Sequence, residues 1–130
     1  MKLRLTALVI ALMIATTACA AELPSATDAE INRALLSGKP SIIDLGARSC
    51  IPCKEMAPIL ESLAKEYSGH ANVLFIDVWQ NKSAGGRFRV QMIPTQIFFD
   101  SRGKEVKRHI GFMDKAALVK ELTTLGAKPK

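Results

Sequence analysis

Hydrophobic residues along this chain alternate between strand-like runs and helix-like spacing. Apolar runs of the kind found in strands buried on both faces occupy residues 41–46 and 72–78. Two later runs, at residues 96–100 and 104–110, flank the turn sequence Ser101-Arg102-Gly103, which predicts a hairpin. Apolar residues spaced three and four apart predict helices at about residues 27–37, 51–67 and 114–125, with a less regular helical segment at 82–88.

The order of these elements is helix, strand, helix, strand, helix, strand, strand, helix. Such alternation with a closing hairpin indicates an α/β domain, in which a central mixed sheet of about four strands has helices on both faces. The chain of 130 residues has room for one domain of ordinary size.

The first 21 residues have the pattern of a secretory signal. Lys2 and Arg4 precede an apolar run at residues 5–15, and small residues follow at a fitting distance for cleavage. We therefore expect residues 1–21 to be a signal peptide and residues 22–130 to be the exported, periplasmic domain.

Cys19 leaves the fate of this leader open. A cysteine at the end of an apolar run also fits a bacterial lipoprotein signal, in which Cys19 would be acylated and would anchor the protein to a membrane. A third alternative is an uncleaved anchor, because residues 5–21 just reach the shortest length that spans a bilayer.

The charge pattern argues against nucleic acid as a partner. The formal charge of the whole chain is +6, and its Lys and Arg residues are scattered among Asp and Glu rather than clustered with aromatic residues. We interpret these charges as a solvated surface, and we expect the protein to be a monomer.

Two cysteines stand where a predicted strand leads into a predicted helix, in the segment Cys50-Ile51-Pro52-Cys53. Free N–H groups and the helix dipole make the start of a helix positive, which favours a thiolate there. A thiolate is the nucleophile of disulfide exchange, and a second thiol nearby can resolve the mixed disulfide. A purely structural bridge would add little, because it closes a loop of only four residues. We interpret the pair as a reversible redox centre.

With these residues in place, the chain resembles the thioredoxin family over nearly all of residues 22–130. Asp44 lies six residues before Cys50, where thioredoxins carry a buried acid, and Pro52 precedes the second cysteine as in that family. The segment Ile93-Pro94-Thr95 is similar to the family's cis-proline segment, and Gly111 to a glycine near its substrate groove. The resemblance implies a thioredoxin fold and a thiol:disulfide oxidoreductase.

The same resemblance implies roles for the site residues. Cys50, as the more exposed thiol, is the expected nucleophile, and Cys53 is the expected resolving thiol. Asp44 is the expected acid/base that exchanges a proton with Cys53. We expect no cofactor apart from the redox-active disulfide between the two cysteines.

Three further residues are expected to bind the substrate. Pro94 should be cis, with the backbone of Ile93 offering hydrogen bonds to an extended substrate strand, and Gly111 should allow close approach of that strand. The expected partners are therefore proteins that carry disulfides.

The chain departs from the family in residues that tune the redox potential. Ser49 and Ile51 replace the usual Trp and Gly on either side of the first cysteine, and Val73 is expected where a lysine usually neighbours the buried acid. Without that cation Asp44 should be harder to ionise. Proline directly before the second cysteine is typical of the reducing members of the family. Pro52 therefore favours a reductase that receives its electrons from a membrane thiol-electron carrier. A disulfide-forming or isomerising enzyme on the same site is the alternative.

Two rival functions come from other classes. A pair of thiolates can bind copper(I), but small copper carriers favour Met where this chain has Arg48, and a zinc site needs four ligands. We therefore expect no metal site. A binding domain without catalysis usually loses one cysteine, and this chain keeps both.

Trp79, at the end of a strand, is expected to pack inside the protein.

Overall fold

The structure is a computed structural model that describes residues 22–130. The expected signal peptide and Cys19 lie outside these described residues. The elements are α1 (Asp28–Leu35), β1 (Ser41–Gly46), α2 (Ile51–Glu66), β2 (Asn72–Asp77), α3 (Lys82–Arg87), β3 (Thr95–Phe99), β4 (Glu105–Ile110) and α4 (Lys115–Thr124). The predicted order is confirmed, and the less regular segment at 82–88 forms the short helix α3.

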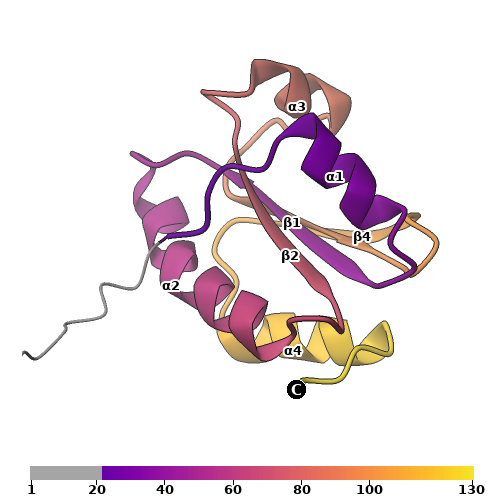
Figure 1. The fold of residues 1–130 in the computed structure, drawn as a ribbon. Helices are drawn as coiled ribbons and strands as arrows, with labels where there is room; N and C mark the ends of the chain where they lie inside the picture. Colours follow the sequence, from indigo (N-terminus) through magenta and orange to yellow (C-terminus); the bar gives the residue numbers. More distant parts are fainter. Residues whose placement is uncertain (1–21) are drawn as a thin grey trace, which may run out of the picture.

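The four strands form one mixed sheet in the order β2-β1-β3-β4. β1 runs parallel to β2 and antiparallel to β3, and β3 is antiparallel to β4. The carboxyl ends of β1, β2 and β4 therefore lie beside the amino end of β3, at the same end of the strands (Figure 1). Ligands of open α/β sheets commonly bind just beyond the carboxyl ends of the strands.

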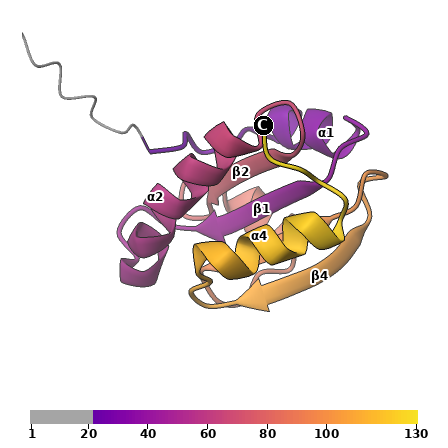
Figure 2. The same cartoon turned by 90° about the horizontal axis from the view of Figure 1, so that it is seen from below.

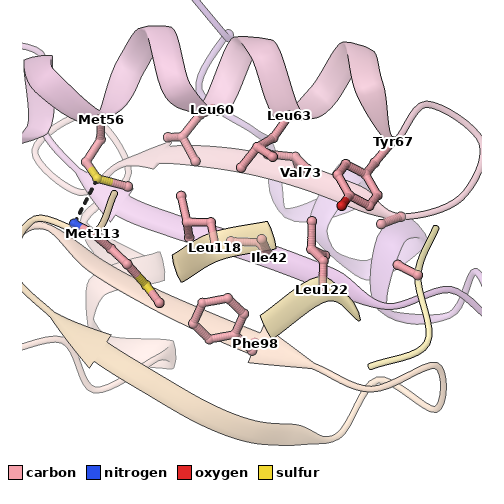
Figure 3. Close-up of a cluster of buried hydrophobic side chains, with 12 residues drawn as sticks. Ile42, Met56, Leu60, Leu63, Tyr67, Val73, Phe98, Met113, Leu118 and Leu122 are labelled. Carbon is pink, nitrogen blue, oxygen red and sulfur yellow. Dashed lines mark hydrogen bonds between the residues drawn. The ribbon is translucent and has the colours of Figure 1, made fainter. Parts of the chain in front are cut away.

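Helices cover both faces of the sheet, as predicted. Helices α1 and α3 lie on one face, and α2 and α4 lie on the other (Figures 1 and 2). The larger core is on the α2 and α4 side, where Met56 and Leu60 of α2 and Leu118 of α4 pack against Ile42 of β1 and other buried residues (Figure 3). This packing fixes the start of α2 relative to the end of β1.

Residues with suitable side chains set the starts of the helices. Thr27 and Glu30 form a capping box at α1, with the Thr27 N–H donating to the Glu30 carboxylate at 2.7 Å. The Asp114 carboxylate accepts from the Ala117 N–H at 2.8 Å and caps α4. At α2 the N-cap is Cys50, which makes no side-chain capping bond, so the first turn of α2 keeps free N–H groups.

Candidate active site

The two cysteines lie where β1 leads into α2. Cys50 is the N-cap of α2, and Cys53 is in its first turn, joined to Cys50 by a disulfide with 5.2 Å between the Cα atoms. Pro52 fits this first turn because its missing N–H would have no helical partner there. Cys50 is half-buried, whereas Cys53 is 4% exposed. An approaching disulfide can therefore reach the sulfur of Cys50 more easily than that of Cys53.

The side chains around Cys50 face solvent. Ser49 and Pro52 are exposed, and Ile51 is 73% exposed. No acidic residue lies in the first turn of α2. The positive end of the helix dipole at Cys50 is therefore not neutralised within the helix, which favours a thiolate at this position.

Gly46, the last residue of β1, lies directly against Cys53. A Cβ atom at position 46 would be 3.1 Å from Sγ of Cys53 and 3.3 Å from Cε2 of Phe75. Gly46 is not among the site residues predicted from the sequence, although a glycine inside a strand pattern signals close approach of another group. The missing side chain makes room for Cys53 under the start of α2.

Asp44 is buried in β1, two residues before Gly46. Because side chains alternate along a strand, Asp44 points to the same face as Gly46, and its Cα lies about 7 Å before that of Gly46 along β1. One carboxylate oxygen, Oδ1, accepts from Nε2 of Gln96 at 2.8 Å, while Oδ2 has no hydrogen-bond partner among residues 22–130. Burial raises the pKa of Asp44 to about 6, and the bond from Gln96 opposes the shift. Sequence reasoning missed Gln96, because only the pairing of β3 with β1 brings it to Asp44.

The residue that pairs with Asp44 on β2 is Phe75, and Val73, expected where a lysine usually neighbours the buried acid, lies two residues before Phe75. Val73 pairs with Ile42, one pleat away. The Arg48 guanidinium stacks over the Phe75 ring at 4.3 Å from its centroid. The alternation of apolar residues in β2 could not reveal this register, which depends on long-range pairing.

Arg48 also binds Glu22 and Leu23, the first residues that the structure describes, and so holds them next to the site. Its guanidinium forms an ion pair with Glu22 at 2.8 Å and donates to the Leu23 carbonyl. Arg48, Cys53 and Phe75 help to line a small cavity of about 10 Å³, which is near the size of one water molecule. The cavity offers a place for a water beside the less exposed cysteine.

Pro94 lies directly before β3, next to the end of β1, because Thr95 pairs with Leu45. Pro94 is buried and its peptide bond to Ile93 is cis. The Pro94 carbonyl accepts from the Gly111 N–H at 2.8 Å, and Gly111 has φ +100°, a conformation that favours glycine. No hydrogen bond within residues 22–130 involves the backbone of Ile93.

The structure thus brings the cysteines, Pro94 and Gly111 to the same end of the sheet's strands, with Asp44 buried behind them. Within residues 22–130 we find no group of three or more His, Cys, Asp or Glu side chains that could hold a metal ion. None of the helices in this described part is long and apolar enough to cross a bilayer.

Comparison with known proteins agrees with this geometry. The model of the thioredoxin family matches residues 22–124. The chain is 41% identical over 92 residues to thioredoxin of Staphylococcus saprophyticus, covering 71% of this chain and 86% of the relative. It is 40% identical over 96 residues to thioredoxin of Staphylococcus aureus, covering 74% and 90% of the two chains.

Solved structures show the same likeness. A mutant thioredoxin from Halobacterium salinarum superimposes with a TM-score of 0.69 at 25% identity, covering 79% of this chain and 88% of that one. Chloroplastic thioredoxin z superimposes with a TM-score of 0.70 at 26% identity, covering 82% and 96% of the two chains.

Proposed function

Because the chain belongs to the thioredoxin family, we propose that it reduces disulfide bonds of exported proteins and is resupplied by a membrane thiol-electron carrier. It is a thioredoxin-like disulfide oxidoreductase, and the proposal concerns the direction, the place and the partners of that activity. The observation that carries the mechanism is the unequal exposure of the two cysteines, with Cys50 half-buried at the helix start and Cys53 buried in the first turn.

The reaction follows from these positions. The Cys50 thiolate attacks one sulfur of a substrate disulfide, and the other substrate sulfur leaves as a thiolate that takes up a proton. Cys53 then loses its proton, attacks Sγ of Cys50 and releases the second substrate sulfur. Two electrons pass to the substrate, and the disulfide of Cys50 with Cys53 forms, which is the oxidised state of this structure.

Asp44 is proposed as the group that accepts the proton of Cys53 before the resolving attack. Its carboxyl group lies on the same face of β1 as Gly46, which contacts Cys53. Because Gln96 is the only hydrogen-bond partner of the Asp44 carboxylate within residues 22–130, we propose that a water relays the proton from Cys53. The pKa of about 6 makes Asp44 a usable acid and base near neutral pH.

The reducing direction is proposed from the residue before the second cysteine. Pro52 stands where the reducing members of the family have proline, and the first turn of α2 holds it next to Cys53. The carrier must supply two electrons as a dithiol, because the oxidised pair has to be reduced again by disulfide exchange.

The place of action is proposed from the leader. Residues 1–21 have the charge and apolar pattern of a secretory signal, so we propose export to the periplasm, with lipid attachment at Cys19 as the alternative. The mass of the mature chain separates these fates, since cleavage near Ala20 and acylation of Cys19 give different N-termini. Recovery of the full-length chain in the cytoplasm would contradict export.

Turnover in an insulin-reduction assay tests the activity itself. We expect reduction by the wild-type domain, its loss in Cys50→Ser, and accumulation of mixed disulfides in Cys53→Ser. Trapping by Cys53→Ser in the producing cell would then name substrates and electron donor. Equal turnover by Cys50→Ser and wild type would contradict the assignment of the nucleophile.

A further inference from the structure

Arg48 and Cys53 border the same small cavity, which is near the size of one water molecule. The ring of Phe75 lies next to both. A Cβ at position 46 would be 3.1 Å from the Cys53 sulfur and 3.3 Å from Cε2 of Phe75, and the Arg48 guanidinium stacks over the same ring at 4.3 Å from its centroid. One aromatic ring thus packs against the guanidinium with its face and lies near the resolving thiol with its edge.

Three charged side chains border this cavity, namely those of Arg48, Lys54 and Glu22. The Arg48 guanidinium and the Glu22 carboxylate form an ion pair at 2.8 Å. Lys54 directly follows Cys53 in α2, and its side chain is exposed. Positive charges therefore outnumber negative ones around the cavity, and Glu22 offsets part of the charge of Arg48.

The resolving step needs a positive charge at this place. Cys53 attacks as a thiolate, and burial disfavours the charged form of a thiol. A buried carboxylate adds to this cost, because Asp77 pairs with Gly46, the residue in contact with Cys53. The Asp77 carboxylate accepts from the N–H groups of Arg48 at 3.1 Å and Trp79 at 2.9 Å, which hold it beside the loop that leads into α2. A cation near Cys53 would offset both effects.

We propose that Arg48 stabilises the thiolate of Cys53 in the resolving step, and that Glu22 limits this effect by pairing with Arg48. The inference rests on the proposed exchange between the two cysteines. In that step Cys53 gives its proton through water to Asp44, and its sulfur bonds to Sγ of Cys50. The substrate sulfur leaves Cys50 with the electron pair of the broken bond. Arg48 acts through Cys53, so it is a positioning residue rather than a catalytic one.

The other charged groups near Cys53 do not replace this cation. Asp44 is neutral once it holds the proton, whereas the Asp77 carboxylate still opposes a second negative charge nearby. Lys54 is exposed and Arg48 is half-buried, so solvent and salt screen the charge of Lys54 more strongly.

Two variants separate a charge effect from the role of the ion pair in holding Glu22 in place. Arg48→Gln and Glu22→Gln break the same ion pair, so a purely structural role would change the resolving rate in the same direction in both variants. A charge effect changes it in opposite directions. We expect Arg48→Gln to slow the resolving step about threefold to tenfold at pH 7, and Glu22→Gln to speed it about twofold. Arg48→Lys keeps the charge and should retain most of the rate.

The reaction of the reduced protein with dipyridyl disulfide, which is uncharged at neutral pH, measures this rate. The Cys50 thiolate attacks the reagent and releases one thiopyridone, and Cys53 then attacks Sγ of Cys50 and releases the second. The absorbance of thiopyridone therefore rises in two phases, of which the second is independent of reagent concentration. Between about pH 5 and pH 9, the midpoint of the second phase should move to higher pH in Arg48→Gln and to lower pH in Glu22→Gln.

The ion pair between Lys107 of β4 and Glu121 of α4 supplies matched controls, because neither residue lines the cavity. Lys107→Gln and Glu121→Gln should leave the second phase unchanged. Changes of the same sign in Arg48→Gln and Glu22→Gln, or no change in either, would overturn the proposal. A wild-type protein that released only the first thiopyridone would lack the resolving step, and the proposed function itself would then fail.

Discussion

Gly46 and Cys53 lie in direct contact, so that even one added carbon at position 46 would stand 3.1 Å from the Cys53 sulfur. This contact joins the last residue of β1 to the first turn of α2. It explains how a buried thiol fits under the helix start while Cys50 remains accessible. The same spot is close to Phe75, so little free space remains for a larger residue.

Gly46→Ala should destabilise the protein by about 1–3 kcal/mol, the usual effect of adding a carbon to a packed interior. Because the new methyl group would press on Cys53, the equilibrium between dithiol and disulfide should shift as well. Urea unfolding of the oxidised and reduced proteins measures the first effect, and equilibration with glutathione measures the second.

Gly86→Ala is the control for this substitution. Gly86 lies in α3, where a methyl group would meet no atom within 4 Å, and alanine is the better helix former. This variant should be as stable as the wild type or more stable. Equal unfolding free energies for Gly46→Ala and Gly86→Ala would show that the contact with Cys53 tolerates the added carbon.

Asp44 should make the folded protein less stable as the pH rises. The pKa of its carboxyl group is raised from 3.8 to about 6 in the folded chain. Between these values the folded state binds a proton that the unfolded state has lost, so the unfolding free energy falls from about pH 4 to pH 6 and then levels off. Asp44→Asn should remove this loss and be about 2–3 kcal/mol more stable at pH 7.

The stability difference between Asp44→Asn and wild type should disappear near pH 4, where Asp44 is protonated in the folded state. Denaturant unfolding at several pH values measures it. Asp28→Asn, a change of an exposed acid on α1, should show no such pH-dependent gain. A constant difference between pH 4 and pH 8 would contradict the raised pKa of Asp44.

Asp44→Asn should also change the pH profile of turnover if Asp44 accepts the proton of Cys53. Asparagine cannot accept that proton, so the resolving step should slow about 10²–10⁴-fold at neutral pH, the usual contribution of such a group. The inflection near pH 6 should vanish from the rate of mixed-disulfide resolution, measured in single-turnover experiments. An unchanged profile would leave Asp44 without a part in proton transfer.

Arg48→Gln should weaken the attachment of Glu22 and Leu23 to the redox site. The variant loses the ion pair with Glu22, the bond to the Leu23 carbonyl and the stacking on Phe75. Because the Arg48 side chain is 34% exposed and solvent screens the pair, we expect a loss of only about 1 kcal/mol. Faster amide hydrogen exchange at Ala26, whose N–H bonds to the Phe75 carbonyl, should accompany it.

Arg102→Gln is the matched control for Arg48→Gln. Arg102 pairs with Asp100 in the hairpin turn, and its side chain is 81% exposed. Its replacement should change stability by less than about 0.5 kcal/mol. Equal losses in the two variants would show that the stacking on Phe75 adds nothing.

The sequence was sufficient for much of the fold and for the position of the redox pair. Local apolar spacing and the turn sequence at residues 101–103 predict the element order, and the redox role of the thiols follows from their place between β1 and α2. These signals are local, so each can be found without knowing which strands pair. The secretory signal and Cys19 remain predictions.

The surroundings of the pair could not be predicted from local signals. Gln96 reaches Asp44 only through the pairing of β3 with β1, and Phe75 pairs with Asp44 because of the register with β2. Trp79 is a large apolar residue of the kind that usually packs in a core, yet the turn formed by Asp77 leaves its side chain exposed to solvent. Each of these positions depends on contacts between distant segments.

The reduction potential of the Cys50–Cys53 couple tests the central claim most directly. It is measured by equilibrating the domain with buffers of known potential and trapping the free thiols. Thioredoxin lies at about −270 mV and the strongest periplasmic oxidant at about −120 mV. A reductase of exported disulfides should have a value close to that of thioredoxin. A value near the strong-oxidant end would contradict the proposed direction of electron flow.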